Sequence, residues 1–549
     1  MTRYQAGKIA PAATALINWF RSDFLGVIRC MRWSYVPPLM VYFAAGVSAF
    51  TGIIEAFFVK EKLGLTAASL ASLGFWAGLP WALKMPLGHL VDLFWRWKAL
   101  FVYLGAAVMG LSLMIMVGLT GYPEQMSNLL PMGTWYVLSV LLAPIGFVLQ
   151  DVVADAMTVE AVPAVREDGV PYPKEEQQQM HVTMQTLGRI AIVGGGAVVA
   201  GAGGWLAMVL SYEAMYWMSL SIPVISVLGV LLASWMGSGR STSGKVYGAP
   251  SRETGRQETI SLDGPIQLDW SILGGSAAFV ALTLTLGLSA IALKEEIVLL
   301  GSLGVIVFLM GRLLRDLDPG KRREIIGIAV IIFVFRAMPG MGAGAGWWQM
   351  DVLGFDEAFF GTLRQVSAIL AIAGMLALRG WMGRRPVPYL VVFLSLYGTV
   401  MMMPFIGMYN GLHEWTQAHF GFGARTIALI DTMADSPLGQ VAMVPMLAWI
   451  AKEAPRNRKA TYFAVMAAFT NLALSASQLA TKYLNKAFVI ERGQYNELGM
   501  LMITVALLGL VLPVMTVFVF QWKGIGKWGR IVSHVKAFRF SGRSKVRPA

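Results

Sequence analysis

Two pairs of aspartates stand inside stretches that are otherwise apolar. Asp151 and Asp155 form one pair, Asp431 and Asp435 form the other, and both read Asp-x-x-Ala-Asp. Residues four positions apart share one face of a helix, so the two carboxylates of each pair repel each other. A low dielectric also favours the protonated form of a carboxyl group. One member of a pair is therefore suited to binding and releasing a proton, which would couple a proton gradient to the movement of a solute.

Basic residues also occur inside apolar stretches, and Arg336 has the most informative surroundings. An ionisable group within a membrane costs several kcal/mol unless it is paired or hydrated, so each one marks a candidate pathway. The segment from 337 to 346 contains four glycines and a proline, which predicts a helix that is broken or tightly packed. Arg336 is then a candidate to bind a carboxylate through two parallel hydrogen bonds. The alternative is close helix packing with the arginine paired to an aspartate.

Three further positions complete the candidate site. Lys84 could contact the solute or extend its amine toward the membrane surface. Gln185 and Asn471 could bond the edge of a heteroaromatic ring or bridge two helices. The predicted substrate-binding or coupling residues are Asp151, Asp155, Asp431, Asp435, Arg336, Arg189, Arg364, Lys84, Gln185 and Asn471. The structural alternative is that the four aspartates pair with Arg189, Arg336 or Arg364 and lock helices together.

The composition predicts that membrane-spanning helices position these residues. Of the 549 residues, 56% are hydrophobic and 14% are charged, whereas soluble domains carry about a quarter charged. A spanning helix needs about 20 mainly apolar residues. About fourteen segments qualify, near 38–59, 67–91, 99–119, 135–160, 182–208, 213–236, 270–291, 296–314, 324–346, 358–379, 387–408, 425–450, 459–481 and 498–521.

The distribution of basic residues predicts the orientation. Most Lys and Arg fall in the segments that are cytoplasmic if the N-terminus is inside, and the loops 120–134 and 347–357 contain none. Both termini are then cytoplasmic, in a cell inner membrane. Anionic lipid headgroups account for the net charge of +13, so no nucleic acid is needed as a partner. Cys30 is the only cysteine, which excludes an intrachain disulfide and a cysteine-based metal site.

Two loops and the aspartate pairs indicate an internal duplication. The segments 63–66 (Leu-Gly-Leu-Thr) and 353–356 (Leu-Gly-Phe-Asp) each join two predicted spans. In each segment the glycine can end one helix, and Thr66 or Asp356 can cap the next. The aspartate pairs follow two spans later in each half. Such parallel repeats are typical of major facilitator transporters. The predicted domains are a cytoplasmic segment 1–37, a six-helix bundle 38–236, a cytoplasmic linker 237–269, two additional transmembrane helices 270–314, a basic loop 315–323, a six-helix bundle 324–521 and a basic tail 522–549.

A motif after the second span resembles the loop between helices two and three of major facilitator proteins. It consists of Gly88 and Asp92 followed by Arg96 and Lys98, with Leu93 in place of the arginine of that motif. The resemblance implies that Gly88, Asp92 and Arg96 form a gating loop.

Within that superfamily the chain is similar to the folate–biopterin transporter family. The matching stretches are 41–43 with Gly46, 62–65, 79–81 with Lys84 and Pro86, 151–160, 353–355, and the run from Asp431 through Pro445, Pro455 and Asn471. The resemblance implies an all-α membrane protein of two six-helix bundles that carries a folate, a pterin or a related organic anion. About two extra central helices distinguish this chain from the twelve that such a family leads one to expect.

The sequence thus predicts a secondary transporter that moves a small polar solute by alternating access, with the proton as the coupling ion. We expect no enzymatic activity, no cofactor and no bound metal, with the lipid bilayer, the solute and H⁺ as partners; the oligomeric state is left open. The alternatives are a major facilitator transporter of another organic anion or drug-like solute, a receptor or scaffold with a transporter-like body, and an intramembrane magnesium-dependent prenyltransferase that uses the Asp-x-x-x-Asp pairs.

Overall fold

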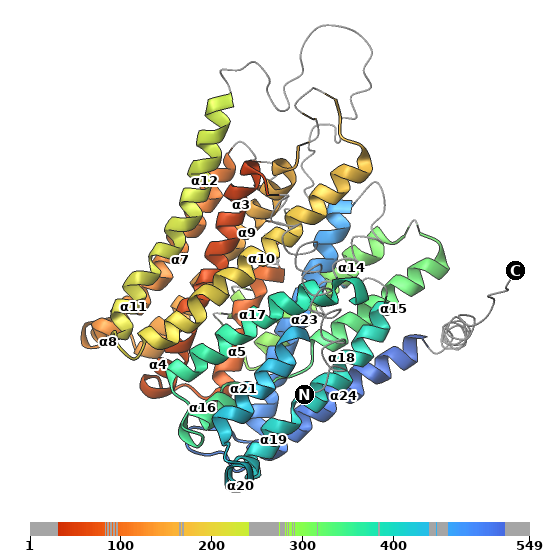
Figure 1. Ribbon diagram of the computed structural model, residues 1–549. Coiled ribbons are helices and arrows are strands. Elements are labelled where there is room, and N and C mark those ends of the chain that lie inside the picture. Colours follow the sequence, from red (N-terminus) through yellow and green to blue (C-terminus); the bar gives the residue numbers. More distant parts are fainter. Residues whose placement is uncertain are drawn as a thin grey trace, which may run out of the picture.

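A computed structural model of the chain describes residues 31–82, 97–163, 170–240, 291–315, 317–382, 385–438 and 459–521, with isolated positions between these ranges. The described residues are almost all helical (Figure 1), and the one isolated β-bridge that they contain joins Glu491 and Gln494. The predicted linker 237–269 and tail 522–549 lie almost entirely outside the described residues, and so does most of the predicted span 270–291.

The N-terminal half, taken here as α3 to α12, begins with a helix that is interrupted by a single 3-10 turn, η3. Its elements are α3 (Val36–Val47), η3 (Ser48–Thr51), α4 (Gly52–Lys62), α5 (Ala67–Ala82), α7 (Lys98–Gly121), α8 (Pro123–Leu129), α9 (Met132–Ala161), α10 (Lys174–Leu206), α11 (Tyr212–Ser219) and α12 (Ser221–Arg240). Within this half α7 packs along α9, and α3 packs against both α10 and α12.

One further helix, α14 (Lys294–Leu313), precedes the C-terminal half, taken here as α15 to α24. The elements of that half are α15 (Pro319–Arg336), α16 (Ala343–Asp351), α17 (Glu357–Met382), α18 (Val387–Met401), α19 (Met403–Tyr409), α20 (Leu412–Phe420), α21 (Ala424–Asp435), η5 (Ser436–Leu438), α23 (Lys459–Ala487) and α24 (Leu498–Gln521). In Figure 1 the N-terminal half, red to yellow, lies beside the green to blue C-terminal half.

Eight helices in the described part of the chain are long and apolar enough to cross a membrane. They are Trp33–Lys62, Lys98–Gly121, Met132–Thr158, Thr186–Leu206, Tyr212–Met236, Glu357–Leu378, Val387–Tyr409 and Leu498–Phe520. Each coincides with a predicted span. The remaining predicted spans fall on shorter, broken, more polar or incompletely described helices, so the number fourteen stays a prediction.

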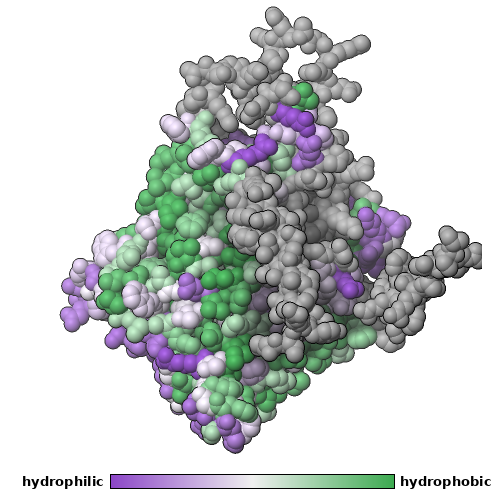
Figure 2. Space-filling view, viewed as in Figure 1, coloured by the Kyte–Doolittle hydropathy of each residue, from purple (hydrophilic) through white to green (hydrophobic). Residues whose placement is uncertain are grey.

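The surface agrees with a membrane location. Figure 2 shows a broad hydrophobic face over the N-terminal helices, with hydrophilic residues toward the ends of the molecule. Large apolar side chains are exposed along α7, α12 and α24, including Leu104, Leu111, Leu228, Trp235 and Val519. Because water would penalise so much exposed apolar surface, these positions suit contact with lipid acyl chains.

Two seams join the halves. At the first seam α5 packs along α23, and at the second α10 packs along α17. Glycines permit the close approach at the second seam, where a Cβ on Gly361 would lie only 2.9 Å from the Cα of Gly204. A larger residue at either position would push the two halves apart.

The loops of the internal repeat begin their helices as the sequence predicts. Thr66 Oγ1 accepts a hydrogen bond from the Ser69 backbone N–H at 3.1 Å, and Asp356 Oδ1 accepts one from the Phe359 N–H at 2.8 Å. Each side chain satisfies a backbone donor that has no partner within its own helix. Gly354 adopts a φ of 65°, a left-handed conformation that glycine reaches without strain.

The predicted break after Arg336 is confirmed. The helix stops at Arg336 and resumes at Ala343, and Gly342 at the restart has a φ of 76°. Side chains of α23 bond the backbone that the break frees. Thr481 Oγ1 accepts from the Gly340 N–H at 2.9 Å, and Ser477 Oγ donates to the Met338 carbonyl at 2.6 Å. An irregular segment at membrane depth needs such partners, because lipid offers none.

Candidate functional site

The first aspartate pair surrounds a single amine. Lys84 Nζ lies 2.5 Å from an oxygen of Asp151 and 2.5 Å from an oxygen of Asp155, and Tyr42 Oη donates to Asp155 at 2.5 Å. The carboxylates lie one turn apart on α9, and Tyr42 lies on α3. The interpretation that Lys84 reaches for the membrane surface is therefore wrong, because two carboxylates hold its amine inside the protein.

Arg189 brings a second positive charge to this group. It lies on α10 and interacts electrostatically with Asp151 and Tyr42. Two carboxylates, one ammonium and one guanidinium sum to zero formal charge. The Lys84 cluster, meaning Tyr42, Lys84, Asp151, Asp155 and Arg189, is thus a nearly balanced arrangement in which burial of the charges is offset by pairing.

Among the residues that the structure describes, the second aspartate pair has no comparable partner. Asp431 and Asp435 lie one turn apart on α21 and repel each other, and neither forms an ion pair within the part of the chain that the structure describes. Asp431 Oδ1 is buried without a hydrogen-bond partner among these residues, whereas the Asp435 side chain is exposed. A buried acceptor without a partner is costly, which makes it a candidate to take up a proton.

Arg336 is the last residue of α15, and its Nε is buried without a hydrogen-bond partner in the described structure. Arg189, from the opposite half, lies close enough to repel it. Arg364 on α17 donates to the Gly52 carbonyl at 3.4 Å and interacts with Glu55 on α4, which accepts from Tyr136 Oη at 2.9 Å.

The interpretation that these arginines lock helices by pairing with the aspartates is not supported for the described residues. No ion pair among them joins Arg189, Arg336 or Arg364 to any of the four aspartates. In the N-terminal half, Lys84 and not an arginine pairs with the aspartates and joins the helices.

The remaining predicted residues have different outcomes. Asn471 Nδ2 donates to the Trp81 carbonyl at 3.3 Å, which bridges α23 and the end of α5. The side chain of Gln185 lies outside the described residues, as do Gly88, Asp92 and Arg96 of the predicted gating loop.

Sequence reasoning missed a set of contacts between the halves that lies at one end of the molecule, near α4 and α16 in Figure 1. Lys60 at the end of α4 pairs with Asp351 at the end of α16, and Tyr495 donates to the same carboxylate. Arg492 donates to the carbonyls of residues 59 and 65 at 2.8 and 3.2 Å, and also to the carbonyl of residue 63. We call this the closed end.

The groups at the closed end are positioned by helix termini. The guanidinium of Arg492 meets carbonyls at the end of α4, where the helix dipole is negative. Nearby, Tyr212 Oη donates to Glu357 at 2.7 Å, again from one half to the other. Burial and the hydrogen bond to Asp351 raise the pKa of Tyr495 to about 12, so this hydroxyl remains a donor at neutral pH. In the sequence, the only indication of these contacts is a basic residue close to the end of a helix, and this does not identify the group that the residue binds.

Comparisons with known proteins agree with this architecture. The profile of the BT1 family matches residues 45–527. A folate-biopterin transporter of Synechocystis is 22% identical over 476 residues, which cover 86% of this chain and 78% of that protein.

Solved transporters share the fold. A POT family transporter in complex with a thioalcohol-conjugated peptide superposes with a TM-score of 0.55 at 12% identity, over 89% of this chain and 96% of that one. The nucleoside transporter NupG gives a TM-score of 0.55 at 11% identity, over 89% of this chain and 99% of that one. At such identities the likeness concerns the fold alone. The family matches are to transporters, so the prenyltransferase alternative drawn from the aspartate pairs is wrong.

Proposed function

This chain belongs to the BT1 family, and we propose that it moves a folate, a pterin or a related organic anion across a membrane, driven by a proton gradient. That it is a multi-pass membrane transporter follows from the family and from its apolar helices. The observation that supports an anionic solute is Arg336, whose Nε is buried without a hydrogen-bond partner in the described structure, while Arg189 of the other half repels its guanidinium group.

Two neighbouring guanidinium groups destabilise each other unless an anion lies between or beside them. A carboxylate of the solute would relieve that repulsion and would satisfy Arg336 Nε through a charge-assisted hydrogen bond. Because the two arginines come from different halves, an anion bound by both would contact both halves at once. The proposal that the solute contains a heteroaromatic ring rests on the name of the Synechocystis relative. The same arginines could bind another organic anion.

The proton has a separate candidate site. Asp431 has an acceptor oxygen without a hydrogen-bond partner among the described residues, and Asp435 adds a second negative charge one turn away. A proton bound here would remove the repulsion within the pair. We propose Asp431 and Asp435 as the coupling residues, and the contacts of Lys84 with Asp151 and Asp155 as a fixed ionic support.

The contacts at the closed end support a state in which the two halves meet on one side of the membrane. With both termini in the cytoplasm of a cell with an inner membrane, this end faces outward, so the conformation is the one that releases solute inward. The same proposal includes two six-helix bundles, about two additional central helices and fourteen spans. Gly88, Asp92 and Arg96 would then lie at the inner side, where the resemblance places a gating loop.

The test is uptake by proteoliposomes that contain the purified protein. We expect radiolabelled folate to accumulate above its external concentration when the outside is more acidic than the inside, and an uncoupler to abolish this accumulation. Empty liposomes control for leak. A panel of folate, biopterin, p-aminobenzoate and a nucleoside as competitors identifies the class of solute. If no organic anion competes or accumulates under any imposed gradient, the proposal is overturned.

A further inference from the structure

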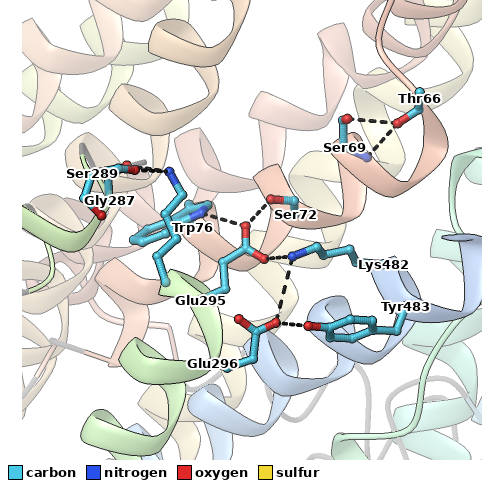
Figure 3. Close-up of polar contacts among 11 residues, drawn as sticks. Thr66, Ser69, Ser72, Trp76, Gly287, Ser289, Glu295, Glu296, Lys482 and Tyr483 are labelled. Carbon is cyan, nitrogen blue, oxygen red and sulfur yellow. Dashed lines mark hydrogen bonds and ion pairs between the residues drawn. The ribbon is translucent and has the colours of Figure 1, made fainter. Parts of the chain in front are cut away.

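One carboxylate links three helices at the first seam between the halves (Figure 3). Glu295, in the first turn of α14, accepts hydrogen bonds from Ser72 Oγ and from Trp76 Nε1 (3.2 Å) on α5 through Oε1. Its other oxygen, Oε2, pairs with Lys482 Nζ on α23. Because α5 belongs to the N-terminal half and α23 to the C-terminal half, a single side chain of the intervening helix holds both.

The residues around Glu295 reinforce the start of α14. Glu296 accepts a hydrogen bond from Tyr483 Oη and lies 3.9 Å from Lys482 Nζ. Lys294 Nζ donates to the carbonyls of Gly287 and Ser289 at 2.8 and 3.2 Å. Acidic residues in the first turn of a helix are also favoured by its dipole. The start of α14 is thereby fixed over the seam.

The seam under α14 is tightly packed along its length. A Cβ on Gly74 would lie 2.9 Å from Gln478 Oε1, and one on Gly78 would lie 2.7 Å from Ser475 Oγ. An apolar cluster extends this contact and contains side chains from α5, α14 and α23, including Phe75, Leu79, Val298, Ile306 and Leu472. Such close packing leaves the helices little freedom to separate.

Burial distinguishes this ion pair from those at the closed end. The side chains of Lys482 and Glu295 are 11% and 5% exposed, whereas those of Lys60 and Asp351 are 16% and 35% exposed. Breaking a buried pair leaves charges without water or a partner, which costs far more than breaking a pair that solvent can reach. A conformational cycle should therefore open the Lys60–Asp351 contact and retain the Glu295–Lys482 contact.

We propose that Glu295, Lys482 and α14 make the seam between α5 and α23 a pivot that stays closed while the two halves rock about it. The closed end opens and closes in each cycle, and the Glu295 bridge persists throughout. Glu295 and Lys482 act as positioning residues, which hold the helices and do not contact the solute. This assignment rests only on the chain being a transporter and not on the identity of its solute or coupling ion.

The experiment compares two cross-links in a Cys30→Ser background. The first is a disulfide between Gly78→Cys and Ser475→Cys, because a Cβ on Gly78 would lie 3.8 Å from the Ser475 Cβ, the spacing that a disulfide favours. The second joins Lys60→Cys and Asp351→Cys with a short reducible bis-thiosulfonate. Transport is measured before and after reduction. A pair of spin labels at Leu129→Cys on α8 and Phe420→Cys on α20, both exposed positions, reports the opening of the closed end without any solute.

The disulfide at the seam should leave both the uptake rate and the width of the label-distance distribution within about twofold of the uncross-linked protein. The cross-link at the closed end should lower the uptake rate at least about tenfold and should narrow the distribution of label distances. Reduction should reverse the second effect. If the seam disulfide arrests uptake and narrows the distances, the pivot is wrong. If uptake fails in every protein while the label distances still respond as expected, the pivot stands and the proposed solute is at fault.

Variants of Glu295 separate positioning from coupling. We expect Glu295→Gln to lower uptake, and the Gly78–Ser475 disulfide to restore it to within about twofold, because a covalent link replaces the lost ion pair. Glu295→Lys combined with Lys482→Glu should also recover uptake relative to either single variant. If neither the disulfide nor the charge exchange rescues uptake in a folded protein, Glu295 does not act by holding the seam.

Discussion

The two aspartate pairs share the motif Asp-x-x-Ala-Asp but differ in the side chains that surround them. In the N-terminal half Lys84 lies between Asp151 and Asp155, and Tyr42 donates to the second of them. In the C-terminal half Asp431 keeps a buried oxygen without a partner in the described structure. A duplicated motif therefore need not have a duplicated role, because the partners determine whether a carboxylate is held in an ion pair or is available to bind a proton.

The repeat shows which residues of the C-terminal half stand at the positions that correspond to Lys84 and Tyr42. At the offset of 290 residues that aligns the loops at 63 and 353, Lys84 corresponds to Gly374 and Tyr42 to Ile332. Gly374 lies against the backbone of Pro437, where a Cβ would overlap the chain, and Ile332 is fully buried among apolar side chains. At these two positions the C-terminal half therefore has neither the amine nor the hydroxyl, and packing at Gly374 leaves no room for the amine.

The largest expected effect is the loss of Lys84. Lys84→Met should lower the free energy of unfolding by about 3–5 kcal/mol, because it leaves two partly buried carboxylates without their shared cation. Thermal unfolding of the detergent-purified protein measures this. The matched control is Arg166→Gln, which removes an exposed pair with Glu176 and should cost less than about 1 kcal/mol. Equal small losses in both variants would mean that the first aspartate pair needs no fixed partner.

The next effect concerns Arg336, whose Nε has no hydrogen-bond partner in the described structure. Arg336→Gln should weaken folate by roughly tenfold to a hundredfold, since a hydrogen bond to a charged group contributes about 1.5–3 kcal/mol, and should weaken neutral biopterin much less. Competition against labelled folate in proteoliposomes gives both affinities. Arg364→Gln is the control, because Arg364 already bonds the Gly52 carbonyl. If Arg336→Gln weakens both compounds equally, structural damage and not lost recognition is the cause.

The smallest effect compares the helix caps of the two loops. Thr66→Ala and Asp356→Ala should each cost about 1 kcal/mol near neutral pH, because each removes a bond to an orphan N–H. Although burial would raise it, the pKa of Asp356 is held below its ordinary value by the Phe359 N–H and by Arg425. Its contribution is thus present above the unfolded pKa and is lost as the pH falls through the folded one. Stability measured against pH should show this loss in wild type and in Thr66→Ala but not in Asp356→Ala.

The sequence predicted the parts of this structure that follow from local chemistry. The apolar stretches, the caps at Thr66 and Asp356 and the broken helix after Arg336 depend on residues that are near one another in the chain. Such features follow from the hydrophobic pattern and from the helix-start and helix-stop residues, both of which can be read from a single sequence. Eight of the predicted spans were recovered for the same reason.

The partners of the charged residues were not predictable. Lys84 meets residues 67 and 71 positions away, Lys60 meets Asp351, and Glu295 reaches α5 and α23 at once. Nothing local specifies which distant charge comes near, because helix packing determines it. The predicted span 296–314 begins at the acidic start of α14. The sequence gives no sign that Glu295 joins the two halves, because its partners lie on distant helices.

The most direct test of the account measures the proton dependence of uptake in Asp431→Asn and Asp151→Asn. The initial rate of solute uptake by proteoliposomes is recorded with an acidic exterior and without a pH gradient, and the ratio of the two rates is compared with wild type. We expect Asp431→Asn to lower this ratio to about one while solute exchange without a gradient continues. Asp151→Asn leaves Lys84 paired with Asp155 and should keep the ratio of wild type. An unchanged ratio in Asp431→Asn, or an equal loss in both variants, would contradict it.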